Sequence, residues 1–470
     1  MQKNQNINNY LVSPSLDEYE IISSKYKSIY LSVEIKGLNV DPLLIYKLLK
    51  SENCFYMQKT LPGQSEPYET IMGLKNNKVK KISGENPIKK LREEIKKNKL
   101  STFCNENYDH NGLFSYFSYE CFKYFDKVPE LKKDPNNFPE CLIIMPELIS
   151  TYHHKNKKLI ISKKITKPFN KNNYIKSRSN LIKIAETINN QLKNLKIDVA
   201  KKLPGTRLNG VIDKDKYIKK IKSIKKEIIA GELIQCVLTQ RFKKISKVDD
   251  QYLIEYLSQN YPSEYIYQIS LKEFSITGSS PEMFLKVANN IATIRPVAGT
   301  IASIKGKTKE LIEKLKSSVK DKAEHIMLVD LARNDLGKVS NPGSVKVNKL
   351  METMVYKNVI HLVSEVNGEL RDDKDFLDAF SSTFPIGTLV GAPKIRAAEL
   401  IHDLEEEGRG PYCGAIGWFS CEGNLEASTI IRTVIKKDEE LSFNGGGGIV
   451  FDSIPEVEYQ ETLDKVKAFW

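Results

Sequence analysis

The chain has 470 residues, of which 40% are hydrophobic and 28% charged. This is an ordinary globular composition, long enough for one large domain or two intertwined ones, and it excludes a fibrous or largely disordered chain. The formal net charge is +13, but the lysines are spread along the chain and no nucleic-acid-binding motif occurs, so we expect anionic small-molecule substrates and no nucleic acid.

The cysteines and the apolar runs predict a cytoplasmic protein. Seven cysteines occur, an odd number at irregular spacing and mostly in apolar surroundings, which favours reduced thiols. There is no Cys-x-x-Cys pair for zinc and no Gly-x-Cys-x-Gly elbow for a glutaminase nucleophile. The N-terminal MQKNQNINNY lacks an apolar signal core, and the longest apolar runs are too short to span a membrane.

The first part of the chain alternates strand-like runs with turns. From about residue 28 to residue 145 these runs are interrupted by one helix, PIKKLREEIKKNKL, and the segments ISTYHH and NKKLIISKKI then predict a hairpin. A helix follows to about residue 195. The Pro- and Gly-containing VAKKLPGTRLNG is the predicted linker, which divides the chain into an N-terminal domain (1–200), intertwined with the core, and a catalytic domain (201–470).

The second part opens with an amphipathic helix. Its predicted cap is Asp213 or Asp215, it ends at Gly231, and its apolar stripe consists of Ile218, Ile221, Ile224 and Ile228. Beyond it, strands arrive in hairpin-like runs and helices are grouped between them. This order predicts an α+β fold in which antiparallel β-sheets form a sandwich-like core flanked by helices.

Two pairs of carboxylates are candidate metal ligands. Asp321 and Glu324, like Glu458 and Glu461, are three positions apart in helical segments and therefore share a helix face. If the two faces converge, they form an oxygen-only site for a small hard cation such as Mg²⁺. Paired acids on two solvated surface helices are the alternative interpretation.

Glycine-rich segments suggest an anion site. Gly387, Gly391 and Pro393 form a loop before a helix predicted over residues 395–407, where backbone amides could face an anion, although a plain tight turn explains them as well. The run Gly445–Gly448 offers further amides. Arg432 provides a fork suited to a carboxylate, and its usual alternative is a surface arginine.

Several of these motifs together closely resemble one family. SITGSSPEMF, IRPVAGT, DKAEHIMLVDLARNDLGKV, FPIGTLVGAPKIRA, RGPYCGAIGW, IIRT and GGGGIVFDSIPEVEYQETLDKVKA are similar to the chorismate-utilising enzymes, specifically the component I subunits of anthranilate synthase. The resemblance is very specific from about residue 214 to the C-terminus and looser before it.

The resemblance implies roles for individual residues. It implies Mg²⁺ held by Glu324 and Glu461, with Asp321 and Glu458 in support and Lys465 nearby. Glu282 matches the general acid that protonates the departing hydroxyl at ring carbon 4, and His361 matches a histidine linked to the elimination step. The enolpyruvyl carboxylate of chorismate would be held by Tyr412, Arg432 and the backbone of Gly445, Gly446, Gly447 and Gly448.

Two positions bear on which reaction is catalysed. Gln235 stands where water-adding relatives carry a lysine base, and an amide is no base near neutral pH, so ammonia is the expected nucleophile. Ala298, in the IRPVAGT motif that also contains Thr300, stands where aminodeoxychorismate synthases carry a nucleophilic lysine. Direct amination at carbon 2 follows, although GPYCGAIGW and GGGGIVFDS read more like the aminodeoxychorismate branch.

The expected function is therefore Mg²⁺-dependent conversion of chorismate to anthranilate in tryptophan biosynthesis. Ammonia would come from a separate glutamine amidotransferase in a hetero-oligomer. The alternatives are an aminodeoxychorismate synthase component I and an inactive regulatory paralogue. Lys59 and Glu264 depart from the segments that resemble the family's tryptophan pocket, and we therefore expect weak or absent tryptophan inhibition.

Overall fold

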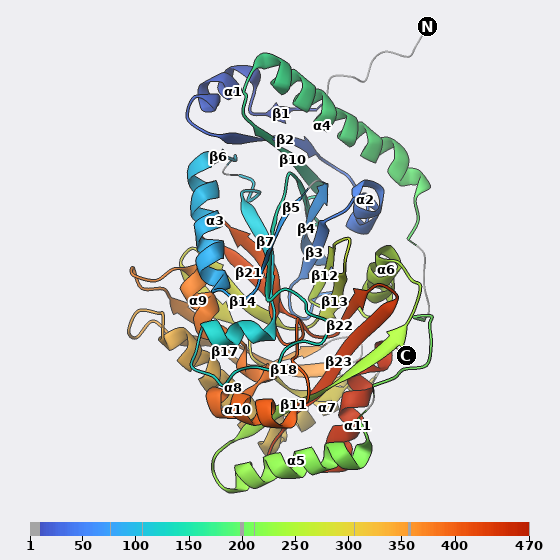
Figure 1. Ribbon diagram of the computed structural model, residues 1–470, viewed down its shortest axis with the longest axis vertical. Helices are drawn as coiled ribbons and strands as arrows, with labels where there is room; N and C mark the ends of the chain where they lie inside the picture. Colours follow the sequence, from blue (N-terminus) through green and yellow to red (C-terminus); the bar gives the residue numbers. More distant parts are fainter. Residues whose placement is uncertain are drawn as a thin grey trace.

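The computed structural model of the protein (Figure 1) describes residues 10–75, 77–105, 107–197, 202–210, 212–304, 306–355 and 359–469. Within these residues, two large β-sheets lie face to face, and the strand pairs are antiparallel except for β2 with β6. The predicted α+β class and the antiparallel sandwich flanked by helices are confirmed.

The larger sheet runs from N-terminal strands at one edge to C-terminal strands at the other. In spatial order its strands are β1 (Val12–Ser13), β2 (Ser28–Ile35), β10 (Lys158–Thr166), β9 (Leu148–His153), β4 (Pro67–Lys75), β3 (Cys54–Thr60), β12 (Tyr265–Ser270), β13 (Ser275–Ser280), β22 (Thr433–Lys437), β23 (Glu440–Ile449), β11 (Gln235–Ile245) and β19 (Gly391–Ala392), with β6 (Thr102–Phe103) beside β2. The predicted hairpin is β9 and β10.

The smaller sheet also combines strands from the N-terminal and C-terminal parts of the chain. In spatial order its strands are β16 (Val297–Ala302), β18 (Val359–Glu369), β15 (Ile291–Ile294), β14 (Met283–Ala288), β21 (Leu425–Thr429), β20 (Ala415–Ser420), β7 (Gly112–Phe117), β8 (Cys141–Met145) and β5 (Lys78–Ile82), with β17 (Lys346–Val355) beside β18.

Both sheets join the two predicted parts of the chain. In the larger sheet β3 pairs with β12, and in the smaller one β7 pairs with β20. Blue and cyan N-terminal strands accordingly continue into yellow, green and red ones in Figure 1. Of the predicted linker, residues 199–201 lie outside the described residues. The structure thus places strands from both sides of residue 200 in each sheet.

Aromatic side chains fill the space between the sheets. Phe55 of the larger sheet stacks on Phe114 of the smaller one, with ring centroids 4.2 Å apart, and Trp418 packs beside them. These side chains belong to a buried cluster drawn from both sheets. Because such rings bury large apolar areas, this layer is a main source of the sandwich's stability.

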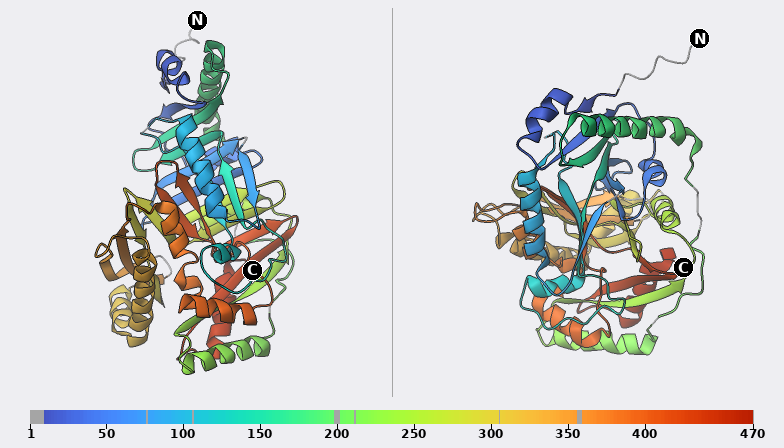
Figure 2. Two further views of the ribbon diagram at one scale, coloured as in Figure 1. Left: turned by 60° about the vertical axis from the view of Figure 1, so that its left-hand side comes forward. Right: turned by 45° about the horizontal axis from the view of Figure 1, so that its top comes forward.

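The helices cover the outer surfaces and the ends of the molecule (Figures 1 and 2). Helix α4 lies across β2 and β10 at one end, whereas α5 lies at the opposite end. The helices are α1 (Leu16–Ser23), α2 (Pro42–Leu49), α3 (Pro87–Ser101), α4 (Lys171–Gln191), α5 (Lys214–Ile229), α6 (Asp250–Asn260), α7 (Thr308–Ser317), α8 (Val319–Gly337), α9 (Phe376–Thr383), α10 (Lys394–Leu404) and α11 (Pro455–Val466), with 3-10 turns η1 (Tyr119–Tyr124), η2 (Leu192–Asn194), η3 (Gly387–Leu389) and η4 (Lys467–Phe469). No helix in the described ranges has the length and apolar character to cross a membrane.

The amphipathic helix predicted from the isoleucine stripe is α5. The Asp213 side chain accepts hydrogen bonds from the amides of Asp215 and Lys216, so Asp213 is the N-cap. Ile218, Ile221 and Ile224 are buried, and Gly231 has a φ of +82° just beyond the helix. The local pattern therefore predicted both ends of this helix correctly.

A buried ion pair fixes β11 to the segment after α10. Arg409 is 2% exposed and donates two hydrogen bonds to Glu405 and one each to the backbone carbonyls of Leu389 and Val237. Glu405 in turn accepts from the amide of Thr239. The two charges are thus paired and hydrogen-bonded, the condition under which burial is tolerated, and they hold the strand that begins at Gln235.

Candidate functional site

The two acid-bearing helices converge, as the sequence analysis predicted they would if both pairs belonged to one site. Helix α8 carries Asp321 and Glu324, and α11 carries Glu458 and Glu461. Burial raises the pKa of Glu324, and the charges of Asp321, Glu458 and Glu461 raise it further against the opposing effect of Lys320. The charge of one carboxylate acts on another over a limited distance, so the acids of α11 lie close enough to α8 to raise the pKa of Glu324.

This region fits a small cation, although the side chains do not yet enclose one. A side chain on Gly447 would lie 3.2 Å from Glu458 Oε2 and 3.7 Å from Glu461 Oε1, so the glycine leaves room above the acids. Among the residues that the structure describes, no group of three or more possible ligands is gathered tightly around one point. Mg²⁺ needs few protein carboxylates and keeps several positions for water and substrate, and the oxygen-only donor set suits it.

The run Gly445–Gly448 lies in β23. One edge of this part of the strand pairs with β11, and the other edge is not paired with β22. The Thr239 amide donates to Glu405 and the Val237 amide to the Val390 carbonyl, so both point away from β23. Their partners across the strand pair are Gly446 and Gly448, whose amides must therefore point away from β11 as well. The amides of Gly445 and Gly447 point toward β11. Only alternate glycines of the run thus offer amides to the open edge, where β22 has diverged from β23 beyond Ser442.

Lys465 links this strand to the acids. Its ammonium donates to the Gly446 carbonyl at 2.6 Å and lies 2.7 Å from Glu461 Oε1. It also lowers the pKa of Glu282 by its charge. One lysine therefore lies among the glycine strand, the acid pair and the predicted general acid.

Arg432 connects Tyr412 with the acids of α11. Arg432 has a φ of +50° in the bend between β21 and β22. Its side chain is exposed, yet burial lowers its pKa, while the nearby Tyr412 and Glu461 raise it. The guanidinium therefore lies within reach of the charges of Tyr412 and Glu461.

Glu282 is a buried carboxyl held by a hydroxyl. The Thr388 Oγ1 donates to Glu282 Oε1 at 2.6 Å, and the carboxyl is 7% exposed. Burial raises the pKa of Glu282 to about 7, with Thr388 opposing the shift. Much of the population is therefore protonated at neutral pH, which a general acid requires. The sequence analysis did not identify Thr388, and only its place in the IGT segment hinted at a role.

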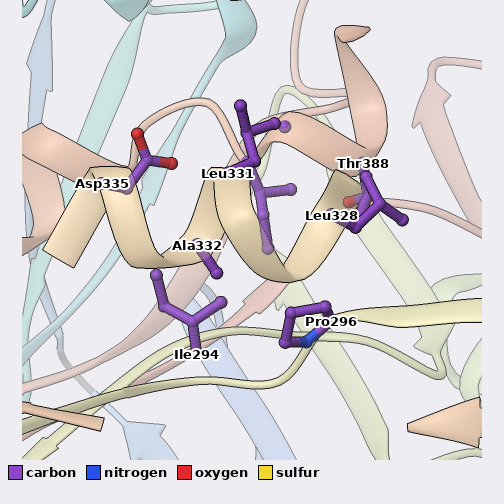
Figure 3. Close-up of a pocket in the computed structure, with 9 residues that line it drawn as sticks. Ile294, Pro296, Leu328, Leu331, Ala332, Asp335 and Thr388 are labelled. Carbon is purple, nitrogen blue, oxygen red and sulfur yellow. The ribbon is translucent and has the colours of Figure 1, made fainter. Parts of the chain in front are cut away.

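A small pocket is lined in part by Thr388 (Figure 3). Helix α8, the strand end at Pro296 and the turn at Thr388 enclose it. Its lining is mainly apolar and consists of Ile294, Pro296, Leu328, Leu331, Ala332, Asp335, Ile386, Gly387 and Thr388. Thr388 therefore lines this pocket and also donates the hydrogen bond to Glu282.

Gln235 lies against the end of the glycine run. A side chain on Gly448 would come within 2.3 Å of its Nε2, and Gln235 Oε1 is buried without a hydrogen-bond partner in the described structure. Gly391 pairs with this strand through β19, where a side chain would meet the Gln235 carbonyl. Close packing thus explains Gly391, and the turn needs no anion. The helix after it, α10, ends at Leu404 rather than at residue 407.

Ala298, Thr300 and His361 come together in neighbouring strands. In β16, Ala298 and Thr300 flank a bulge at Gly299, and Thr300 pairs with His361 of β18. The Thr300 side chain lies outside what the structure describes. Burial lowers the pKa of His361, and the charge of Arg432 lowers it too, so His361 lies near Arg432.

The segments predicted to depart from the tryptophan pocket lie side by side. Lys59 pairs with Tyr265 across β3 and β12, next to Glu264. Its buried ammonium lies 2.7 Å from Glu69 and 3.6 Å from Glu426 of the other sheet. Although burial opposes it, the charges of Lys59 and Lys286 lower the pKa of Glu426 to about 2. An internal ion cluster therefore occupies this part of the sandwich.

Comparisons with known proteins identify related chains. The family model for chorismate binding enzymes matches residues 52–470. The anthranilate synthase component 1 of Acetivibrio thermocellus is 33% identical over 97% of this chain and 97% of its own length. That of Aquifex aeolicus is 33% identical over 98% of this chain and 94% of its own.

Solved structures share the fold. Anthranilate synthase component I of Streptococcus pneumoniae superposes with a TM-score of 0.74 at 28% identity, covering 93% of this chain and 98% of that one. The menaquinone-specific isochorismate synthase of Escherichia coli gives 0.72 at 17% identity, with 97% of both chains covered, and shows the fold alone. The match of the family model over most of the chain and the near full-length relatives lead to one conclusion: this chain belongs to the chorismate binding enzymes, in the group of anthranilate synthase component 1.

Proposed function

We propose that the protein converts chorismate to anthranilate, with ammonia as the nitrogen donor and Mg²⁺ as the cofactor. The observation that carries the proposal is that these groups lie close enough for their charges to act on one another. Lys465, which lies 2.7 Å from Glu461 Oε1, acts on the buried carboxyl of Glu282, Glu461 acts on Arg432, and the acids of α11 act on Glu324 of α8. Full-length similarity to proteins named anthranilate synthase component 1 supports the same reaction.

Chorismate carries two carboxylates, and two groups of residues suit them. Arg432, Tyr412 and the amides of Gly446 and Gly448 would hold the enolpyruvyl carboxylate. Glu324 and Glu461, supported by Asp321 and Glu458, would hold Mg²⁺. When bound, the ion would neutralise the ring carboxylate and draw electron density from the ring.

The first step adds ammonia and removes water. Ammonia forms a bond to ring carbon 2, the two ring double bonds each shift by one position, and the bond between carbon 4 and its hydroxyl breaks. Glu282 gives its proton to the departing hydroxyl, and the added nitrogen loses one proton. Gln235 Oε1, buried without a partner among the described groups, is suited to accept a hydrogen bond from the incoming ammonia.

The second step eliminates pyruvate. A base removes the proton at carbon 2, the bond from carbon 3 to the enolpyruvyl oxygen breaks, and the ring becomes aromatic. The enolpyruvate gains a proton and leaves as pyruvate. His361 is the proposed participant because it lies on β18 near Arg432, and burial keeps its ring neutral near pH 7.

The ammonia would come from a glutamine amidotransferase subunit in a hetero-oligomer. This part of the proposal rests on the resemblance to component I proteins and on the missing glutaminase elbow in the sequence. Ala298 supports direct amination at carbon 2. A lysine at this position could form a covalent adduct with the ring, whereas the methyl group of alanine cannot.

Product identification tests the proposal. Purified protein incubated with chorismate, Mg²⁺ and ammonium is expected to yield anthranilate, detected by its blue fluorescence and confirmed by mass spectrometry. Addition of glutamine with a glutamine amidotransferase should replace ammonium. Accumulation of 4-aminodeoxychorismate would assign the protein to the other branch, and no amination in any mixture would favour an inactive paralogue.

Tryptophan inhibition is a separate expectation. Lys59 places an ammonium, paired with Glu69 and Glu426, between segments that resemble the family's effector pocket. A bound amino acid would have to break these buried ion pairs, at a cost of several kcal/mol (about 3–5). We therefore expect anthranilate formation to be unchanged by micromolar tryptophan in the same assay. Half-maximal inhibition in that range would contradict the expectation.

A further inference from the structure

His325 connects helix α8 with strands β16 and β18. It follows Glu324 on α8, is 0% exposed and has a partner on each ring nitrogen. Its Nδ1 lies 3.2 Å from the Ala298 carbonyl, and its Nε2 lies 2.6 Å from Ser364 Oγ. The sequence analysis quoted this histidine inside a motif and gave it no role.

The partners determine which nitrogen carries the proton. A carbonyl only accepts, so Nδ1 donates to Ala298. Ser364 Oγ already accepts from the Met351 amide at 2.9 Å, and its own proton therefore goes to Nε2. A ring that donates on one side and accepts on the other is the neutral form of histidine.

The strands that His325 joins are those of the site. Ala298 immediately precedes the bulge at Gly299, and Ser364 lies three positions beyond His361 on β18. The helix approaches the bulge closely, since a side chain on Gly299 would lie 3.3 Å from the Asp321 Cβ. The absence of a side chain at Gly299 thus lets α8 approach β16 closely, and the hydrogen bond from His325 to the Ala298 carbonyl joins the two elements.

We propose that His325 is a positioning residue: its bond to the Ala298 carbonyl holds the carboxylates of α8 in register with β16, where the nucleophile meets the ring. The inference rests on the proposed function. It assigns the Ser364 bond a supporting part, which is to hold the imidazole in the tautomer that donates to Ala298.

Two substitutions separate the two bonds. In His325→Asn the amide nitrogen takes the place of Nδ1 and keeps the bond to Ala298, whereas the bond to Ser364 is lost. In His325→Gln the longer side chain reaches Ser364 and leaves the Ala298 carbonyl without its donor. Each variant therefore removes one hydrogen bond, and their stabilities should fall by similar amounts.

Calorimetric titration of Mg²⁺ into the protein provides a readout that does not depend on turnover. We expect His325→Gln to weaken Mg²⁺ binding about tenfold or more, and His325→Asn to weaken it clearly less. With ammonium as donor, His325→Gln should lower kcat with little change in the KM for chorismate, because Arg432 and Tyr412 are not displaced.

His110 offers a matched control. It is also a buried histidine with two partners, Ser162 at 2.6 Å and Thr151 at 2.8 Å, but it lies against β9 and β10 of the N-terminal part. His110→Asn should lower the melting temperature like the His325 variants and leave Mg²⁺ affinity unchanged. Equal Mg²⁺ affinity in wild type and His325→Gln would overturn the inference. Absence of anthranilate from the wild-type enzyme would instead overturn the proposed function.

Discussion

Replacement of Glu282 by glutamine should lower kcat for anthranilate formation about 10²–10⁴-fold, the usual contribution of a positioned general acid. The amide keeps the size of the side chain and can still contact Thr388, but it has no acidic proton for the hydroxyl that leaves carbon 4. Chorismate binding, measured calorimetrically without ammonia, should change little. Near-normal turnover in this variant would remove Glu282 from the proton transfer.

The same residue predicts the pH dependence. With a pKa raised to about 7, the carboxyl is protonated below neutral pH and loses its proton above it. Because the protonated form is the active one, kcat/KM should fall as the pH rises through about 7. Thr388→Val removes a hydrogen bond that stabilises the carboxylate, so the pKa should rise and the falling limb should move to higher pH. If the falling limb of the pH profile did not move in Thr388→Val, the limb would report the titration of a group other than Glu282.

Replacement of Glu461 by alanine should reduce activity to background. This carboxylate lies on α11 facing the α8 acids and beside Lys465, and its loss leaves Mg²⁺ without one of its two principal proposed ligands. The Lys465 ammonium would then also lack its carboxylate partner, and its positive charge would no longer be neutralised. Titration of Mg²⁺ should show little or no binding heat, and added Mg²⁺ should not restore turnover.

The matched control lies on the same helix. Glu456 is an exposed carboxylate in the first turn of α11, and Glu456→Ala should retain Mg²⁺ binding and activity. Both variants lose one acid from one helix, so a general effect of helix charge would appear in both. Turnover near the wild-type level in Glu461→Ala would exclude this residue from the metal site.

Local pattern and resemblance predicted different parts of the molecule. The isoleucine spacing and the Asp213 cap were enough for α5, because these signals act within a few residues. Thr388 and His325 were missed because their partners are 106 and 27 positions away in the chain, and nothing local indicates such contacts. The glycine run was recognised, but which amides are available depends on the strand register with β11, which residue type does not reveal.

The sharing of both sheets between the two parts of the chain has a consequence for its folding. A fragment that ends near residue 200 would leave β3 without β12 and β7 without β20, and would expose the aromatic side chains of Phe55 and Phe114. Unpaired strand edges with such surfaces favour aggregation. The two parts should therefore unfold in one cooperative transition, and neither should fold stably when it is produced without the other.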